Sequence, residues 1–176
     1  MLHIGHMEYL LSGKAQCEYL LIGISNPDIS LTKYSESNPH RSSAISNPLT
    51  YFERFQMIKG AMIGAGVKRN EFDVVPFPIN RPDLLLNYVP GNAKFYITVY
   101  DEWGIDKRKT LVSLGCNVDV TAIEEGDKPT SGSFVRDCIR RGKPWNHLVP
   151  KYVYDYITSS GLDERIREMH SPKDGV

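Results

Sequence analysis

Two histidines near the start of the chain have the spacing and the chemistry of a phosphate-binding pair. His3 and His6 stand three residues apart at the start of a predicted helix over 5–16, so their imidazoles point to the same side of it. The unpaired amides of a first helical turn favour anions, and Gly5 leaves the backbone open to a phosphate. This cluster is suited to a polyphosphate. The alternative is a pair of histidines that frays into solvent.

A second cluster of hydroxyl and cationic groups lies at the start of another predicted helix. The turn Ser131-Gly132-Ser133 runs straight into a helical pattern, and either serine is a favourable N-cap. Arg136 follows within reach of an anion held at that helix start. The alternative is an ordinary capped helix with a solvated arginine. Together, the two helix starts could grip one polyphosphate from opposite sides.

Strands and helices alternate along the chain and must position these two clusters. Short apolar runs predict strands at 17–24, 72–78, 94–100 and 117–121. Helices are predicted from Thr50 to residue 64 or 66, weakly at 83–88, at 101–114, and from 134 onward with breaks at 142–144, 150 and 161. Thr50 and Glu53 form a capping-box pattern, and the stretch 25–48 is a predicted long loop.

The alternation predicts an α/β fold with a doubly wound, mostly parallel sheet. In such sheets, ligands bind beyond the carboxyl ends of the strands. We therefore expect the two clusters to meet at that edge.

Composition narrows the class of protein. The 176 residues are 41% hydrophobic and 24% charged, and 21 Lys and Arg balance 21 Asp and Glu. This predicts one globular domain over 1–176, with a core at 1–129 and the second cluster and C-terminal helices at 130–176. The neutral balance argues against a nucleic-acid partner, and no apolar run is long enough to span a membrane. Three cysteines without metal-ligand spacing favour free thiols in the cytoplasm.

Four segments resemble the nucleotidyltransferase superfamily that shares a fold with class I aminoacyl-tRNA synthetases. In chain order they are 3–6 (HIGH, resembling H-x-G-H), 47–54 (NPLTYFER, similar to N-P-F-T-x-x-E-R), 131–136 (SGSFVR, resembling I-S-S/G-T-x-x-R) and 142–150 (GKPWNHLVP, resembling G-x-x-W-x-x-L-V-P). Within that superfamily the chain looks most like the archaeal-type nicotinamide mononucleotide adenylyltransferases.

The resemblance implies a Rossmann-like fold and transfer of a nucleoside monophosphate from ATP or CTP to a small phosphate-bearing acceptor. Pyrophosphate is released, and NAD biosynthesis is the commonest family instance. By resemblance, His3 and His6 would bind the phosphates and stabilise the transition state, while Arg136 would hold the leaving phosphates. Mg²⁺ would bridge the triphosphate oxygens, because the chain offers no dedicated carboxylate cage. The remaining nucleotide-binding residues implied are Gly5, Arg54, Ser131, Gly132 and Ser133.

Two stretches depart from the archaeal pattern. Where those enzymes carry a Ser-Gly-Asn type turn near the nucleobase, this chain has Thr98 to Trp103, which leaves adenine and cytosine both open. Where they stack nicotinamide on a tryptophan, only Tyr88 offers a ring, either to bind substrate or to pack under the loop. The acceptor therefore need not be nicotinamide mononucleotide. Transfer to another phosphorylated metabolite and a non-catalytic nucleotide-binding module are the alternatives, and the oligomeric state stays open, a homo-oligomer included.

Residues near the C-terminus have simpler interpretations. Asp163, Glu164 and Arg165 are predicted to form a solvated helix face. Trp145 is predicted to pack among the C-terminal helices.

The start of the chain carries one further expectation. In the family, the H-x-G-H loop follows the first and central strand of the sheet, and Met1 stands where the turn after that strand should end. We expect that strand to be missing from this chain. A central parallel strand is buried on both faces, so its absence would leave a trough through the core and unpaired backbone on two neighbours.

Overall fold

The computed structural model describes residues 1–25, 48–99, 102–121 and 130–169. The predicted loop at 25–48 lies almost entirely outside the described residues, as do two residues of the departing stretch at 98–103. The elements, in chain order, are α1 (Ile4–Lys14), β1 (Leu20–Ser25), α2 (Tyr51–Gly64), η4 (Arg69–Glu71), β2 (Phe72–Phe77), α3 (Pro82–Leu85), β3 (Lys94–Thr98), α4 (Glu102–Ser113), β4 (Asn117–Thr121), α5 (Gly132–Arg140), η5 (Asn146–Leu148), α6 (Lys151–Ser159) and α7 (Leu162–Glu168).

The predicted alternation of strands and helices is confirmed, with small differences at the boundaries. α2 begins after Thr50, whose hydroxyl accepts a hydrogen bond from the Glu53 amide, and the capping box is present. β1 begins at Leu20, three residues later than predicted. The preceding Tyr19 is exposed, and its hydroxyl donates a hydrogen bond to the Asp73 carboxylate. The weakly predicted helix at 83–88 is the single turn α3.

All described strands pair in parallel. β1 pairs with β2, from Leu20 opposite Phe72 to Ser25 opposite Phe77. β3 pairs with β4, from Lys94 opposite Asn117 to Thr98 opposite Thr121. The α/β class with parallel pairing is confirmed, although the described strands form two separate pairs.

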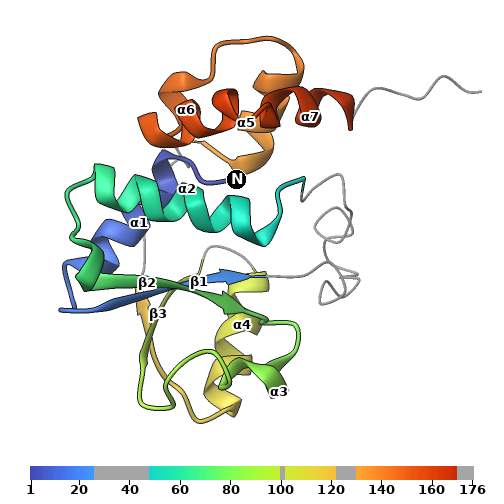
Figure 1. The fold of residues 1–176 in the computed structure, drawn as a ribbon. Coiled ribbons are helices and arrows are strands. Elements are labelled where there is room, and N and C mark those ends of the chain that lie inside the picture. The colour runs from blue at the N-terminus through green and yellow to red at the C-terminus, as the bar shows by residue number, and fades with distance from the viewer. Residues whose placement is uncertain (26–47, 100–101, 122–129, 170–176) are drawn as a thin grey trace, which may run out of the picture.

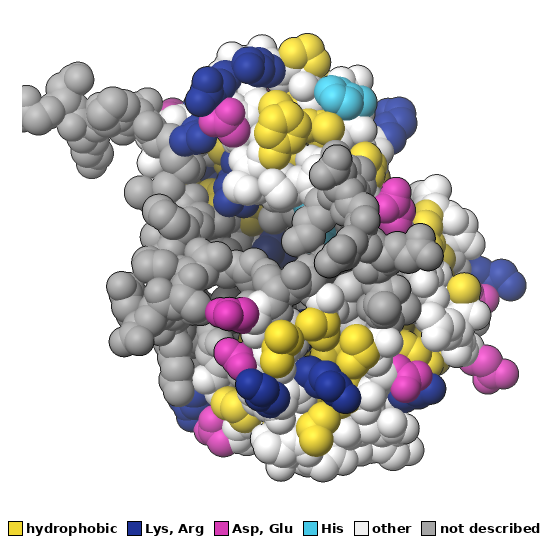
Figure 2. Space-filling view, turned by 180° about the vertical axis from the view of Figure 1, so that it is seen from behind, with side chains coloured by type: hydrophobic (Ala, Val, Ile, Leu, Met, Phe, Trp, Pro, Cys, Tyr) yellow, Lys and Arg dark blue, Asp and Glu magenta, His cyan; other side chains and the backbone are white. Residues whose placement is uncertain are grey.

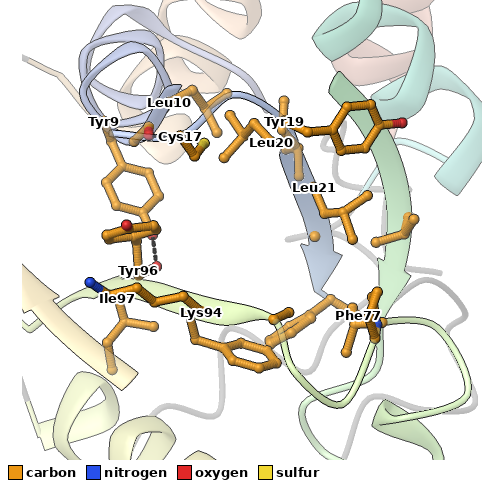
Figure 3. Close-up of a pocket in the computed structure, with 18 of the residues that line it drawn as sticks. Tyr9, Leu10, Cys17, Tyr19, Leu20, Leu21, Phe77, Lys94, Tyr96 and Ile97 are labelled. Carbon is orange, nitrogen blue, oxygen red and sulfur yellow. Dashed lines mark hydrogen bonds between the residues drawn. The ribbon is translucent and has the colours of Figure 1, made fainter. Parts of the chain in front are cut away.

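A cavity of about 580 Å³ separates the two strand pairs. Residues 20–23 of β1 line one side of it and residues 94–97 of β3 line another (Figure 3). The Tyr9 hydroxyl of α1 donates a hydrogen bond to the Tyr96 carbonyl across one end. A mostly apolar cavity therefore lies between β1 and β3. The missing first strand and the single-domain organisation stay predictions.

The buried hydrophobic residues form two clusters, and β2 contributes to both. The first joins β1 and β2 to α1, α2 and the C-terminal helices, and Trp145 belongs to it, buried beside the Tyr154 ring at 4.6 Å. The packing prediction for Trp145 is thus confirmed. The second cluster joins the end of β2, through Phe77, to α3, β3 and α4. In Figure 1, α2 lies between the β1–β2 pair and helices α5 to α7, while α3 and α4 lie on the other side of the strands. No described helix is long and apolar enough to cross a membrane.

Candidate active site

The two histidines lie against each other at the start of α1. His3 is the N-cap with an extended backbone (φ −141°, ψ 173°), and its carbonyl accepts from the amides of His6 at 3.0 Å and Met7 at 3.2 Å. The two imidazole rings stack with their centroids 3.8 Å apart. His3 is buried, with 8% of its surface exposed. The same-side arrangement predicted from their spacing is therefore present.

The surroundings of His6 favour its neutral imidazole. His6 is exposed at the surface, yet desolvation by neighbouring protein and the charges of His3 and the Met1 amine lower its pKa to about 3, against the effect of a hydrogen bond with the Met1 backbone. A neutral imidazole presents one N–H donor and one acceptor nitrogen. His6 can therefore bind a phosphate oxygen by hydrogen bonding without being a cation beforehand.

The second cluster forms the capped start of α5. Ser131 is the N-cap, and its hydroxyl accepts from the Phe134 amide at 3.1 Å. Ser133, the other predicted cap, lies inside the first turn with its Oγ 3.0 Å from that of Ser131. Both hydroxyls thus lie at a helix start whose free amides favour an anion.

Gly132 brings the second cluster into contact with the first. A Cβ built on Gly132 would lie 3.4 Å from the backbone nitrogen and oxygen of Met1, and 3.5 Å from Arg136 Nη1. Burial, together with the positive charges of Arg136 and Arg54, lowers the pKa of the Met1 amine to about 5. The start of the chain, Arg54 and Arg136 therefore share one electropositive region.

Arg54 reaches this region from the capped start of α2. Its Nη1 donates to the Ser25 carbonyl at 2.8 Å, and its Nε donates to the Thr50 carbonyl at 3.4 Å. Ser25 is the last residue of β1, so the guanidinium lies at the carboxyl end of the strand, where ligands bind in parallel α/β sheets.

The chemistry of the assembled groups is that of an anion site. Burial lowers the pKa of Arg54 and of Arg136, with Arg140 adding to the shift at Arg136, yet arginine stays charged at neutral pH. Two half-buried guanidiniums, two imidazoles and two helix starts supply donors from several sides. Within the described ranges, no three His, Cys, Asp or Glu side chains are grouped to hold a metal ion.

Tyr88 is not brought into this group. It follows α3 and is 40% exposed, and the α3 segment lies on the opposite side of the molecule from Met1 (Figure 1). Its role in binding an acceptor stays a prediction.

The large cavity between β1 and β3 is a different place from the anion site. Its lining includes Lys107, whose pKa burial lowers to about 8, but none of His3, His6, Arg54 and Arg136. Most side chains that line the cavity are apolar, so the cavity is better suited to hydrophobic packing than to binding a triphosphate.

The prediction that Arg165 belongs to a solvated face is wrong. Its guanidinium binds the Glu53 carboxylate with both terminal nitrogens, at 2.8 and 2.5 Å, and Nη2 also donates to the Pro48 carbonyl at 2.8 Å. Glu53 and Arg165 are 112 residues apart, so no local pattern could have revealed this contact.

The chain is similar to known nucleotidyltransferases along nearly its whole length. It is 43% identical over 166 residues to a phosphonoformate cytidylyltransferase of Streptomyces viridochromogenes, covering 94% of this chain and 90% of that protein. It is 25% identical over 171 residues to a nicotinamide-nucleotide adenylyltransferase of Saccharolobus solfataricus, covering 95% and 90%. It is 28% identical over 168 residues to the nicotinamide-nucleotide adenylyltransferase of Pyrococcus abyssi, covering 95% and 82%. No protein-family model matches the chain.

The chain belongs to the nucleotidyltransferase superfamily. It is an enzyme that transfers a nucleotidyl group from a nucleoside triphosphate to a phosphate-bearing small molecule.

Proposed function

We propose that this chain is a cytidylyltransferase whose acceptor is a small phosphonate of the phosphonoformate class, in which a carboxylate adjoins the phosphonate. The observation that carries the proposal is the 43% identity over 94% of the chain with the Streptomyces phosphonoformate cytidylyltransferase. The adenylyltransferase relatives reach only 25–28% over a similar length. The absence of a tryptophan between residues 80 and 88 also favours an acceptor that lacks a nicotinamide ring.

The reaction is a displacement at the α-phosphorus of the triphosphate. An anionic oxygen of the acceptor phosphonate attacks this phosphorus, and a new P–O bond forms. The bond from the α-phosphorus to the bridging oxygen of the β-phosphate breaks, and its electron pair leaves with pyrophosphate. Because the attacking oxygen is already ionised, no protein base has to remove a proton from it. The protein contributes alignment and charge stabilisation.

Each basic group then has a distinct task. His6 would donate its N–H to a nonbridging oxygen of the α-phosphate, where charge rearranges in the transition state, and the stacked His3 would hold the ring in place. Arg136 would bind the leaving β- and γ-phosphates with the hydroxyls of Ser131 and Ser133 beside it. Arg54 would approach the same phosphates from the carboxyl end of β1.

A divalent cation fits this site only together with the triphosphate. The donors assembled at the helix starts are imidazoles, guanidiniums, amides and hydroxyls, which suit phosphate oxygens rather than a resident cation. Mg²⁺ would enter bound to the triphosphate and would supply neutralisation of its negative charge.

The test is a grid of two nucleotides and two acceptors. Pyrophosphate release would be measured for CTP and ATP, each with phosphonoformate and with nicotinamide mononucleotide, in the presence of Mg²⁺. We expect release with CTP and phosphonoformate, and ³¹P NMR should show a new phosphonate–phosphate anhydride. The Arg136→Ala variant should release little. Preferred turnover of ATP and nicotinamide mononucleotide would overturn the proposed substrates, and CTP binding without pyrophosphate from any pair would indicate a binding module.

A further inference from the structure

An ion pair between Arg165 and Glu53 connects α7, the last described helix, to the start of α2. Arg165, on α7, binds both carboxylate oxygens of Glu53 and the carbonyl of Pro48. The arrangement is bidentate, which fixes orientation as well as distance. The side chain of Glu53 is 14% exposed and that of Arg165 36% exposed, so the pair lies at the edge of the protein interior.

The same carboxylate also completes the cap of α2. Glu53 Oε2 accepts from the Thr50 amide at 2.8 Å, while the Glu53 amide donates to the Thr50 hydroxyl at 3.2 Å. Burial alone would raise the pKa of Glu53, but the hydrogen bonds from Arg165 and Thr50 outweigh burial and hold this pKa below its usual range. The carboxylate is therefore ionised when it joins the cap to α7.

The residue that follows Glu53 is Arg54. Its guanidinium is held by the carbonyls of Ser25 and Thr50, so its position depends on where the first turn of α2 lies relative to β1. The cap residue Thr50 is thus shared: its amide binds Glu53 and its carbonyl binds Arg54. A shift of the Glu53 carboxylate would move both.

Helix α7 also contacts α5, the helix that carries Arg136. Arg167 Nε donates to the Ile139 carbonyl, near the end of α5, at 3.2 Å. One short helix therefore touches both helices whose starts carry the guanidiniums of the anion site.

We infer that Arg165 is a positioning residue for the triphosphate site. By fixing Glu53 and Pro48 it holds the start of α2, and with it the guanidinium of Arg54, at the carboxyl end of β1. The inference rests on the proposed function in one respect, namely that Arg54 binds the triphosphate. Because Glu53 is largely buried in this pair, loss of Arg165 should also lower the free energy of unfolding, so the effect on nucleotide binding is measured in variants that remain folded.

The test is a double-mutant cycle between Arg165 and Arg54. Arg165→Met should raise the KM for CTP by about tenfold, the loss expected when one charged hydrogen-bonding anchor is removed. Arg165→Lys keeps the charge without the two-pronged geometry and should recover only part of this loss. In an Arg54→Ala background, Arg165→Met should raise the KM for CTP by less than about twofold, because Arg54, the residue through which Arg165 acts, has been removed.

Arg69 offers a matched control. Its guanidinium likewise binds a backbone carbonyl, that of Phe72 at 2.5 Å, and a carboxylate, that of Asp73 at 2.6 Å. This pair lies at the amino end of β2, away from the anion site, so Arg69→Met should leave the KM for CTP unchanged.

Two outcomes would overturn the positioning role: a full effect of Arg165→Met in the Arg54→Ala background, or an equal effect of Arg69→Met. An Arg54→Ala variant with an unchanged KM would instead contradict the proposed binding role of Arg54. Thermal unfolding of each variant separates these cases from misfolding, and Arg165→Lys supplies the KM if Arg165→Met does not fold.

Discussion

The β1–β2 pair and the β3–β4 pair share the same parallel geometry, but their surroundings differ. Around β1 and β2, three helix starts bring buried or half-buried basic groups together, and the cluster of apolar residues beneath them extends through five helices. Around β3 and β4 the apolar cluster is smaller, whereas exposed hydrophobic side chains occur in both halves, such as Val112 in one and Phe52 in the other. Figure 2 shows hydrophobic side chains at the surface in this lower part of the molecule, among charged ones.

We expect this difference to separate phosphate binding from substrate selectivity. The described residues of the four segments that resemble nucleotidyltransferases lie in the β1–β2 half, where an anion could be held by groups that act on any nucleoside triphosphate. The described residues of the two stretches that depart from the archaeal pattern, 80–88 and 98–103, lie in the β3–β4 half. We therefore expect substitutions in the first half to reduce turnover with every substrate, and substitutions in the second half to change which substrate is used.

The largest effect is expected from removing a phosphate-binding group. Arg136→Ala or His6→Ala should lower kcat/KM by about 10²–10³-fold, which is typical for loss of one preorganised donor to a transition state. Arg141→Met is the matched control, because Arg141 is the exposed C-cap residue of the same helix and pairs with Asp137 at 2.9 Å. Steady-state kinetics and thermal unfolding should be measured together. Equal loss of activity and of stability in the first two variants would contradict their assignment to the site.

Crowding the junction of the two clusters should have the next largest effect. Gly132→Val would place methyl groups against Met1 and the Arg136 guanidinium, since even a Cβ lies 3.4–3.5 Å from them. We expect kcat/KM to fall on the order of 10-fold, because small displacements of reacting groups are costly. Gly64→Ala, with nothing within 4 Å of the added Cβ, should leave kcat/KM unchanged. Full activity of Gly132→Val would show that the clusters do not act on one ligand.

The depressed pKa of His6 predicts a pH dependence of stability. In the unfolded chain His6 takes up a proton near its ordinary pKa of 6.5, but in the folded protein only near 3. The unfolded state therefore binds more protons between these values, and the free energy of unfolding should fall as pH drops from 6.5 toward 3. In His6→Gln this slope should be smaller, as measured by urea unfolding at several pH values. An unchanged slope would mean that the folded protein protonates His6 as readily as the unfolded chain does.

The smallest effect is expected at Tyr88. Its ring is 40% exposed and lies away from the histidines, so Tyr88→Ala should change the KM for the acceptor by less than about threefold, within the range of substitutions at partly exposed positions. A tenfold rise in the acceptor KM with an unchanged KM for CTP would instead assign Tyr88 to the acceptor site. That result would show that the acceptor is recognised in the β3–β4 half.

The parts of the site that the sequence predicts correctly are the ones determined by neighbours along the chain. The capping box at Thr50 and Glu53 and the N-cap at Ser131 follow from short-range hydrogen bonds between a hydroxyl or carboxylate and amides two or three residues away. The position of His3 and His6 on the same side follows from their spacing at a helix start, although the stacking of their rings was not predicted. Each of these features needs no knowledge of the rest of the fold.

The parts that could not be predicted depend on contacts across the fold. Arg165 resembles any charged residue on a short helix, and only the tertiary structure places it on Glu53. The separation of the strands into two pairs likewise has no signature in the apolar runs that predict each strand, because pairing depends on which edges meet. The close approach of Gly132 to Met1 joins distant parts of the chain, so neither local pattern could reveal it.

Triphosphate binding at the helix starts is tested most directly by a crystal structure of the protein with Mg²⁺ and a non-hydrolysable CTP analogue. We predict that the triphosphate lies at the starts of α1 and α5, with its oxygens contacting His6 and Arg136, and with Arg54 approaching from the end of β1. A triphosphate bound in the cavity between β1 and β3, or at the helix starts without contact to His6 and Arg136, would contradict this prediction.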